Sequence, residues 1–303
     1  MLDMRRLRVL LAVQQHGGVA AAARALSFTP PAVSQQIAAL ERQVGLALLD
    51  REPRRARLTA AGERLATHAA AVLARMEEAE AELAGFGGER PTGVVALGVI
   101  PTVGRALLPA ALRALAGTAP DLQVRVEQLE PEGSLPAVAR GELDLAVASE
   151  YTMTPRRRDP RLERRDLGVE PVYVAVPETH RAPDRKVRLA ELADERWIAP
   201  AEPSSCFTML ERACAQAGFD PLVHGHCADF SMALALVAAG QGVAIVPSIA
   251  AGPPYQPAVD GVRLLLTREP AVTRTLYAVV RRGAGAHPGI AHVLAAVAEA
   301  MPR

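Results

Sequence analysis

Residues 19–44, VAAAARALSFTPPAVSQQIAALERQV, decide the fold of the N-terminal region. The alanine-rich run 19–26 predicts a short helix, residues 27–29 a tight connection, and residues 30–44 a further helix. Thr29 can cap this helix, and prolines are tolerated in a first turn. Its apolar stripe, at spacings of 4, 3 and 4, is Val33, Ile37, Leu40 and Val44. With an amphipathic stretch before it, the pattern predicts a helix-turn-helix.

The opposite face of the 30–44 helix is small and polar at its N-terminal end. It presents Pro31, Ser34, Gln35, Ala38 and Arg42. Short side chains allow close approach to a major groove, and amide and hydroxyl groups can bond base edges. An ordinary solvated face is the alternative interpretation.

The excess of positive charge at the N-terminal end indicates that residues 1–60, here called the head, bind a polyanion. Residues 1–60 hold nine arginines against four acidic residues, whereas the whole chain carries a net charge of +1. Residues 46–58 place a proline- and arginine-rich turn between two apolar runs, which predicts a wing hairpin with Arg51, Arg54 and Arg55 at phosphates or the minor groove. Chance clustering in an arginine-rich chain, and a merely solvated loop, are the alternatives.

A heptad pattern follows the wing. From Thr59, a candidate cap, apolar residues recur at Leu65, Ala69, Val72, Met76, Ala79 and Leu83, and the segment ends near Gly87 and Gly88. Such a seam is typical of a dimerisation helix. Packing of the helix on its own domain is the alternative.

Residues 92–303 alternate strands and helices. Strands are predicted at 93–100, 122–129, 143–148, 171–176, 197–199, 224–227, 243–246 and 273–282, and helices at 103–116, 135–140, 207–217, 232–239 and 288–301. This alternation predicts an α/β fold with a parallel sheet covered on both faces.

Ligands of such folds bind beyond the carboxyl ends of strands, near helix N-termini. Thr102, Ser204 and Ser205 could donate to a small anionic effector there, although each could simply be a cap. The rule selects Pro101, Thr102, Ser149, Glu150, Ser204, Ser205, Cys206, Asp229, Phe230 and Pro247.

Other classes of protein find little support. Three cysteines without CxxC spacing exclude a disulfide framework and disfavour structural zinc. His224 and His226 could hold a metal, but such a pair more often lines a pocket or the surface. The chain has no GxSxG, HExxH, P-loop or dinucleotide fingerprint, so we expect no enzyme and no cofactor. Glycines and prolines cut the uncharged segment 231–259, so we expect a cytoplasmic protein rather than a membrane span.

Several ordered motifs resemble LysR-type transcriptional regulators. They are residues 21–26 with 29–41, 49–51, 57–62, 141–146 and 237–247. Pro30 departs from the pattern, because many members carry a base-contacting glutamine at that position. By resemblance, Thr29, Pro30, Pro31, Ser34 and Gln35 would lie at the DNA groove. The resemblance implies a winged helix-turn-helix (1–59), a linker helix for dimerisation (60–88), and a two-lobed effector domain like the periplasmic binding proteins (92–303).

By the same resemblance, lobe I would comprise 92–163 and 269–303, and lobe II 164–268. The partners would be double-stranded operator DNA, a small-molecule effector, a second copy in a homodimer assembling to a homotetramer, and RNA polymerase. Cys206 and Cys214 resemble the cysteine pair of the family's peroxide sensor. Eight helical residues would separate their Cα atoms by about 12 Å, beyond the reach of a disulfide.

Overall fold

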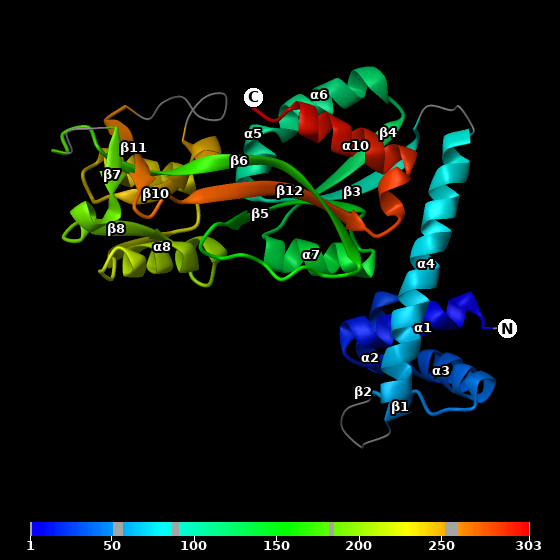
Figure 1. Ribbon diagram of the computed structural model, residues 1–303. Helices are drawn as coiled ribbons and strands as arrows, with labels where there is room; N and C mark the ends of the chain where they lie inside the picture. Colours follow the sequence, from blue (N-terminus) through cyan, green and yellow to red (C-terminus); the bar gives the residue numbers. More distant parts are fainter. Residues whose placement is uncertain (1, 51–56, 87–90, 182–184, 252–259, 303) are drawn as a thin grey trace.

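The computed structural model describes residues 2–50, 57–86, 91–181, 185–251 and 260–302. A helical head holds the N-terminus, the long helix α4 (Ala60–Phe86) rises from it, and a two-lobed α/β domain follows (Figure 1). The predicted fold class is confirmed, while the domain boundaries given above stay predictions.

The head is a three-helix unit with a short hairpin. It consists of α1 (Met4–His16), α2 (Val19–Ala25), α3 (Pro30–Val44), β1 (Leu49–Asp50) and β2 (Arg57–Leu58). The predicted stripe of α3 is buried at Val33, Ile37 and Leu40. Gly45 ends α3 at φ 72°, a conformation that glycine adopts without strain.

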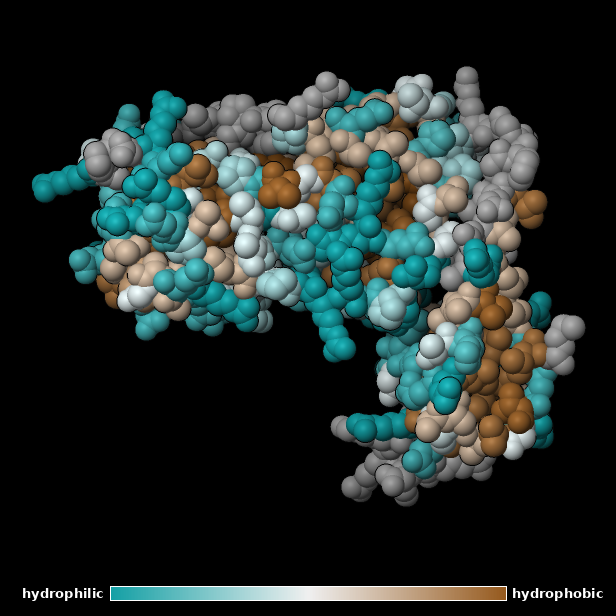
Figure 2. Space-filling view, viewed as in Figure 1, coloured by the Kyte–Doolittle hydropathy of each residue, from teal (hydrophilic) through white to brown (hydrophobic). Residues whose placement is uncertain are grey.

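α4 begins against this core and then leaves it. The Thr59 hydroxyl accepts from the Gly62 amide at 3.1 Å and donates to the Ala47 carbonyl at 2.8 Å, which ties the helix start to the hairpin. Ala66 and Ala69 are buried in the head. Farther along, Val72, Met76 and Leu83 are exposed. The predicted seam therefore packs on its own head at one end and is exposed at the other. Figure 2 shows hydrophobic residues gathered over the head and the adjoining part of α4.

Lobe I has helices on both faces of its sheet. The strands are β3 (Gly93–Val99), β4 (Leu122–Gln128), β5 (Leu145–Tyr151) and β12 (Thr273–Arg281), in the order β4-β3-β5-β12. One face packs on α5 (Pro101–Ala106), α6 (Leu108–Thr118) and α10 (Pro288–Glu299). The other packs on α7 (Pro131–Arg140). The short helix η3 (Ala284–Ala286) and α10 also contact α4, so the linker helix is seated on lobe I.

Lobe II repeats this layering. Its larger sheet contains β7 (Lys186–Arg188), β10 (Ala244–Pro247) and β11 (Val262–Arg268). A smaller parallel sheet joins β8 (Arg196–Pro200) to β9 (Leu222–Cys227). One core lies under α8 (Ser205–Gln216) and η1 (Leu189–Leu192), and a second lies under α9 (Phe230–Ala238). The short helix η2 (Ser248–Ala250) follows β10.

One strand serves both lobes. Residues 162–171 of β6 (Leu162–Pro177) pair with β12, while residues 172–177 pair with β10 and β11. The expectation of a parallel sheet is wrong for β12, which runs antiparallel to β5 and β6, and for β10, which runs antiparallel to β6. β11 also runs antiparallel to β6, but it pairs parallel with β7. Alternation of strands and helices predicts parallel crossover units within each lobe. It does not reveal where the chain passes from one lobe to the other, and the strands at that passage pair antiparallel. In the described residues, no helix is both long and apolar enough to cross a membrane.

Candidate DNA interface and effector cleft

The N-terminal end of α3 is free of packing. Thr29, Pro30, Pro31, Ser34 and Gln35 are all exposed. Thr29 also caps the helix, because its hydroxyl accepts from the Ala32 amide at 3.4 Å. Pro30 and Pro31 carry no amide hydrogen, so the open surface offers side-chain groups instead: the hydroxyls of Thr29 and Ser34 and the Gln35 carboxamide. Such groups suit contact with phosphates and base edges.

The wing is described only at its base. β1 and β2 pair antiparallel at Leu49 with Leu58 and at Asp50 with Arg57, as expected for a hairpin. Arg51, Arg54 and Arg55 lie outside the described residues, and their role stays a prediction.

A cavity of about 590 Å³ lies between the lobes. It is lined by eight of the ten predicted effector residues: Pro101, Thr102, Ser149, Ser204, Ser205, Cys206, Asp229 and Phe230. These residues come from β5, α5, the start of α8 and the turn before α9, so strand ends and helix N-termini of both lobes converge there. The rule for open α/β sheets therefore located the cavity, while contact with an effector stays a prediction.

Two predicted residues point elsewhere. Glu150 forms an ion pair with Arg164 at 2.6 Å and accepts from the Arg156 amide at 3.1 Å. Neighbouring residues of a strand face opposite ways, so Ser149 lines the cavity and Glu150 does not. Pro247 is buried at the end of β10, and the cavity is lined instead by Ile249 and Ala250 beyond it.

A buried ion pair closes the base of the cleft. Arg274, 2% exposed, donates through Nε to Glu170 Oε1 at 2.7 Å. The other oxygen, Oε2, accepts from the Ser248 hydroxyl at 2.8 Å and the Ile249 amide at 2.7 Å. Glu170 thus joins β6, β12 and η2 at the place where the chain passes between lobes. Burial lowers the pKa of Arg274, but the neighbouring Tyr151 and Glu170 outweigh it, and the net pKa is raised.

Tyr151 and Cys206 extend this cluster toward the cavity. The buried Tyr151 hydroxyl interacts with both Arg274 and the Cys206 thiol. Burial raises the pKa of Cys206 to about 11, and burial raises that of Cys214 to about 12. Both thiols are therefore protonated at neutral pH.

The mouth of the cleft is bridged by a second, exposed ion pair. Arg105 of α5 donates to Asp229 Oδ2 at 2.9 Å and also contacts Ser231. Asp229 caps α9 as well, since it accepts from the Ser231 amide at 2.6 Å. Burial would raise the pKa of Asp229, but the Arg105 guanidinium and local amides lower it overall. Lobes I and II are thus already in polar contact across the opening.

Two further polar groups face the cavity. The Thr102 hydroxyl is buried and makes no hydrogen bond to another described residue. The Ser204 hydroxyl caps α8, because it accepts a hydrogen bond from the Phe207 amide at 3.1 Å. This is the capping role expected as the alternative to ligand binding. The hydroxyl proton can still be donated to a ligand.

Sequence reasoning missed five polar lining residues: Arg105, Gln128, Glu130, Tyr151 and Arg274. Gln128 is the last residue of β4 and Glu130 lies just beyond it, so the same rule for strand ends applies to both. Arg274 enters from an antiparallel strand, and no parallel-sheet rule would have found it.

His226 of β9 contacts residues outside its own strand. His226 Nδ1 lies 3.1 Å from the Pro200 carbonyl, and its ring packs on Phe207 with centroids 5.6 Å apart. Among the described side chains, no group of three or more His, Cys, Asp and Glu could hold a metal ion.

Comparison with known proteins agrees with this geometry. The model of the LysR substrate binding domain matches residues 88–302, and that of the bacterial regulatory helix-turn-helix protein, lysR family, matches residues 4–63. A probable hydrogen peroxide-inducible genes activator of Streptomyces viridosporus is 31% identical over 309 residues, covering 99% of this chain and 94% of that protein.

The small neutral protease regulatory protein of Streptomyces coelicolor is also 31% identical, over 308 residues, with 99% and 93% coverage. A full-length OxyR variant from Pseudomonas aeruginosa superposes with a TM-score of 0.67 at 21% identity, covering 99% of this chain and 94% of that one. The two relatives carry different names at equal identity, so identity does not select an effector.

Proposed function

Because this chain belongs to the LysR family of bacterial transcriptional regulators, we propose that the exposed end of α3 reads its operator and that the interlobe cleft takes its effector. As a LysR-type regulator the chain binds DNA and responds to a small molecule. The observation that supports the effector site is the cavity of about 590 Å³, which residues of both lobes line. Lobe I in turn contacts α4, the helix that leads to the head.

The DNA-reading role divides between two kinds of contact. Ser34 and Gln35 supply hydroxyl and amide groups for base edges, whereas the wing arginines bind phosphates without reading sequence. Pro30 cannot donate a hydrogen bond, so base reading shifts to its neighbours on the exposed face. A regulator of this kind acts where the chromosome is, and we therefore place it in the cytoplasm.

The effector we propose is a small polar molecule that touches both lobes. Thr102 and Ser149 would contact it from lobe I, and Ser205 and Asp229 from lobe II. A ligand that binds better when the lobes are closer shifts the population toward the closed form. Since α4 is seated on η3 and α10 of lobe I, such a shift would change the angle between the heads of a dimer. We propose no cofactor and no catalytic step.

Assembly would use the exposed part of α4. Val72, Met76 and Leu83 form an apolar strip that a second α4 would cover. We propose a homodimer through this helix and a homotetramer through the effector domains, with RNA polymerase as a further partner of the bound complex.

The experiment is a DNase footprint of the full-length protein on DNA upstream of its own gene. We expect an extended protected stretch with a dyad, lost when Ser34 and Gln35 are both replaced by alanine. Absence of protection at low salt, followed by random-site selection that enriches no sequence, would refute operator reading by α3.

Peroxide sensing is a second candidate, because Cys206 lines the cleft beside Tyr151 and Arg274. The observations weigh against a disulfide. Cys206 and Cys214 both lie within α8, about 12 Å apart by helix geometry. Their raised pKa values also keep the reactive thiolate scarce. Mass spectrometry after peroxide titration tests the alternative, and an intramolecular disulfide would establish it.

A further inference from the structure

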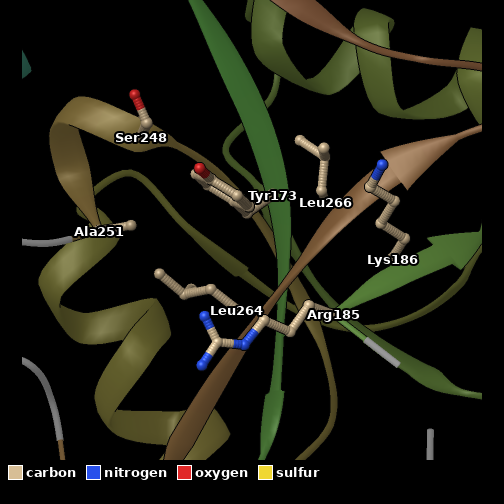
Figure 3. Close-up of a pocket in the computed structure, with 7 residues that line it drawn as sticks. All are labelled: Tyr173, Arg185, Lys186, Ser248, Ala251, Leu264 and Leu266. Carbon is tan, nitrogen blue, oxygen red and sulfur yellow. The ribbon is translucent and has the colours of Figure 1, made fainter. Parts of the chain in front are cut away.

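Part of the sheet face in lobe II is not covered by its helix. Along β6 and β11, one set of alternating side chains packs under α8, and the other set faces α9. α9 ends at Ala238. A cavity of about 470 Å³ lies over the rest of this face, and Tyr173, Leu264 and Leu266 form its apolar floor (Figure 3).

The two charged side chains among the described lining residues of this cavity, Arg185 and Lys186, are cationic. Arg185 and Lys186, the first residue of β7, lie on one side of the apolar floor, and Ser248 and Ala251 lie on the other (Figure 3). Among the described lining residues there is no carboxylate. Arg185 and Lys186 are both exposed, so they can reach a ligand without first losing a buried partner. A ligand with an anionic end and an apolar body matches this layout.

The cavity shares a wall with the interlobe cleft. Ser248 lines the cavity and donates to Glu170, the carboxylate that also holds Arg274. Ile249, next along η2, donates its amide to the same Glu170 oxygen and lines the cleft. A ligand that moves η2 therefore moves Ile249 directly and acts on Arg274 through the Glu170 carboxylate.

We propose that this cavity is a second binding site, specific for small amphipathic organic anions, and that its occupancy is coupled to the interlobe cleft through η2 and Glu170. The site stands on its own geometry, while the coupling rests on the proposed effector role of the cleft. By thermodynamic linkage, the factor by which the second ligand changes the affinity of the cleft for its effector equals the factor by which the effector changes the affinity of the second site.

The probe for the test is 8-anilinonaphthalene-1-sulfonate, which combines a sulfonate with aromatic rings and fluoresces when its rings leave water. Full-length protein should bind it saturably. Lys186→Ala and Arg185→Ala should each weaken binding by about fivefold, the loss expected for one exposed ion pair. Arg188→Ala is the matched control, because Arg188 lies on the same strand but pairs with Glu191 outside the cavity. That control should bind the probe like the wild type.

Three results would overturn the site: no saturable binding up to millimolar probe, equal affinity in the Lys186 and Arg185 variants, or loss of binding only in Arg105→Ala, which would place the anion in the cleft. The coupling has its own measurement, the alkylation rate of Cys206 by iodoacetamide with and without saturating probe. We expect a changed rate, and an unchanged rate refutes the coupling. Neither measurement depends on DNA, so failure here is separate from failure of the footprint.

Discussion

Removing the Glu170 carboxylate should destabilise the effector domain more than any surface substitution. Glu170 and Arg274 side chains are 11% and 3% exposed, and their closest atoms are 2.6 Å apart. Glu170→Ala leaves the guanidinium buried and unpaired, and also removes the acceptor of Ser248 and Ile249. Breaking such a pair costs about 3–5 kcal/mol. For a domain of this size the melting temperature should fall by about 6–20 °C.

Differential scanning calorimetry of the full-length protein measures this loss. The matched control is Glu191→Gln, which breaks the exposed Arg188–Glu191 pair at 2.9 Å and should leave the melting temperature unchanged. The double variant Glu170→Gln with Arg274→Met should recover much of the loss, because the amide oxygen still accepts from Ile249 and no charge stays buried. A loss below about 1 kcal/mol in Glu170→Ala, the range of exposed pairs, would refute the role assigned to this carboxylate.

Three other outcomes are expected. Ser34→Ala or Gln35→Ala should alter sequence preference by about 1–3 kcal/mol at one base pair, measured by fluorescence anisotropy on matched and mismatched operators; equal losses on all sequences would contradict base reading. Met76→Glu should dissociate the dimer in sedimentation experiments, whereas His68→Glu, on an exposed part of α4 outside the predicted seam, should not. Because the pKa of Cys206 is raised to about 11, its thiolate fraction and its alkylation by iodoacetamide should rise with pH up to that value; a plateau below pH 9, near the ordinary thiol pKa, would contradict the burial of this thiol.

Much of the fold was predictable because its signals are local. Thr29 with Pro30, the stripe of α3 and the apolar runs of β3 and β5 depend on neighbouring residues, and the structure confirms each of these elements. β7 and β11 were not predicted. β7 has only three residues, too few to show a period, and β11 (VRLLLTR) does not alternate between apolar and polar residues.

Cleft residues at the ends of parallel strands could be predicted from the sequence. Those contributed by the antiparallel strand β12 could not. Thr102 and Ser205 follow the rule for parallel strands. Arg274 and Glu170 meet only because β12 and β6 are antiparallel neighbours, 104 residues apart in the chain. Glu150 shows that the rule locates a strand end but not the exact residue. A shift of one residue along a strand replaces a side chain that faces the cavity by one on the opposite face.

The shared strand β6 determines how the lobes can move and how they can fail. β6 stays paired along its length, with β12 in lobe I and with β10 and β11 in lobe II. The lobes can therefore twist about this strand, whereas separating them would break its hydrogen bonds. Lobe I also takes β12 from the end of the chain, after all of lobe II has been built. Lobe I is therefore assembled from two separate segments of the chain, and the whole of lobe II is inserted between them. Heat should melt the two lobes in one cooperative step, and a lesion in either lobe should lower the melting temperature of both.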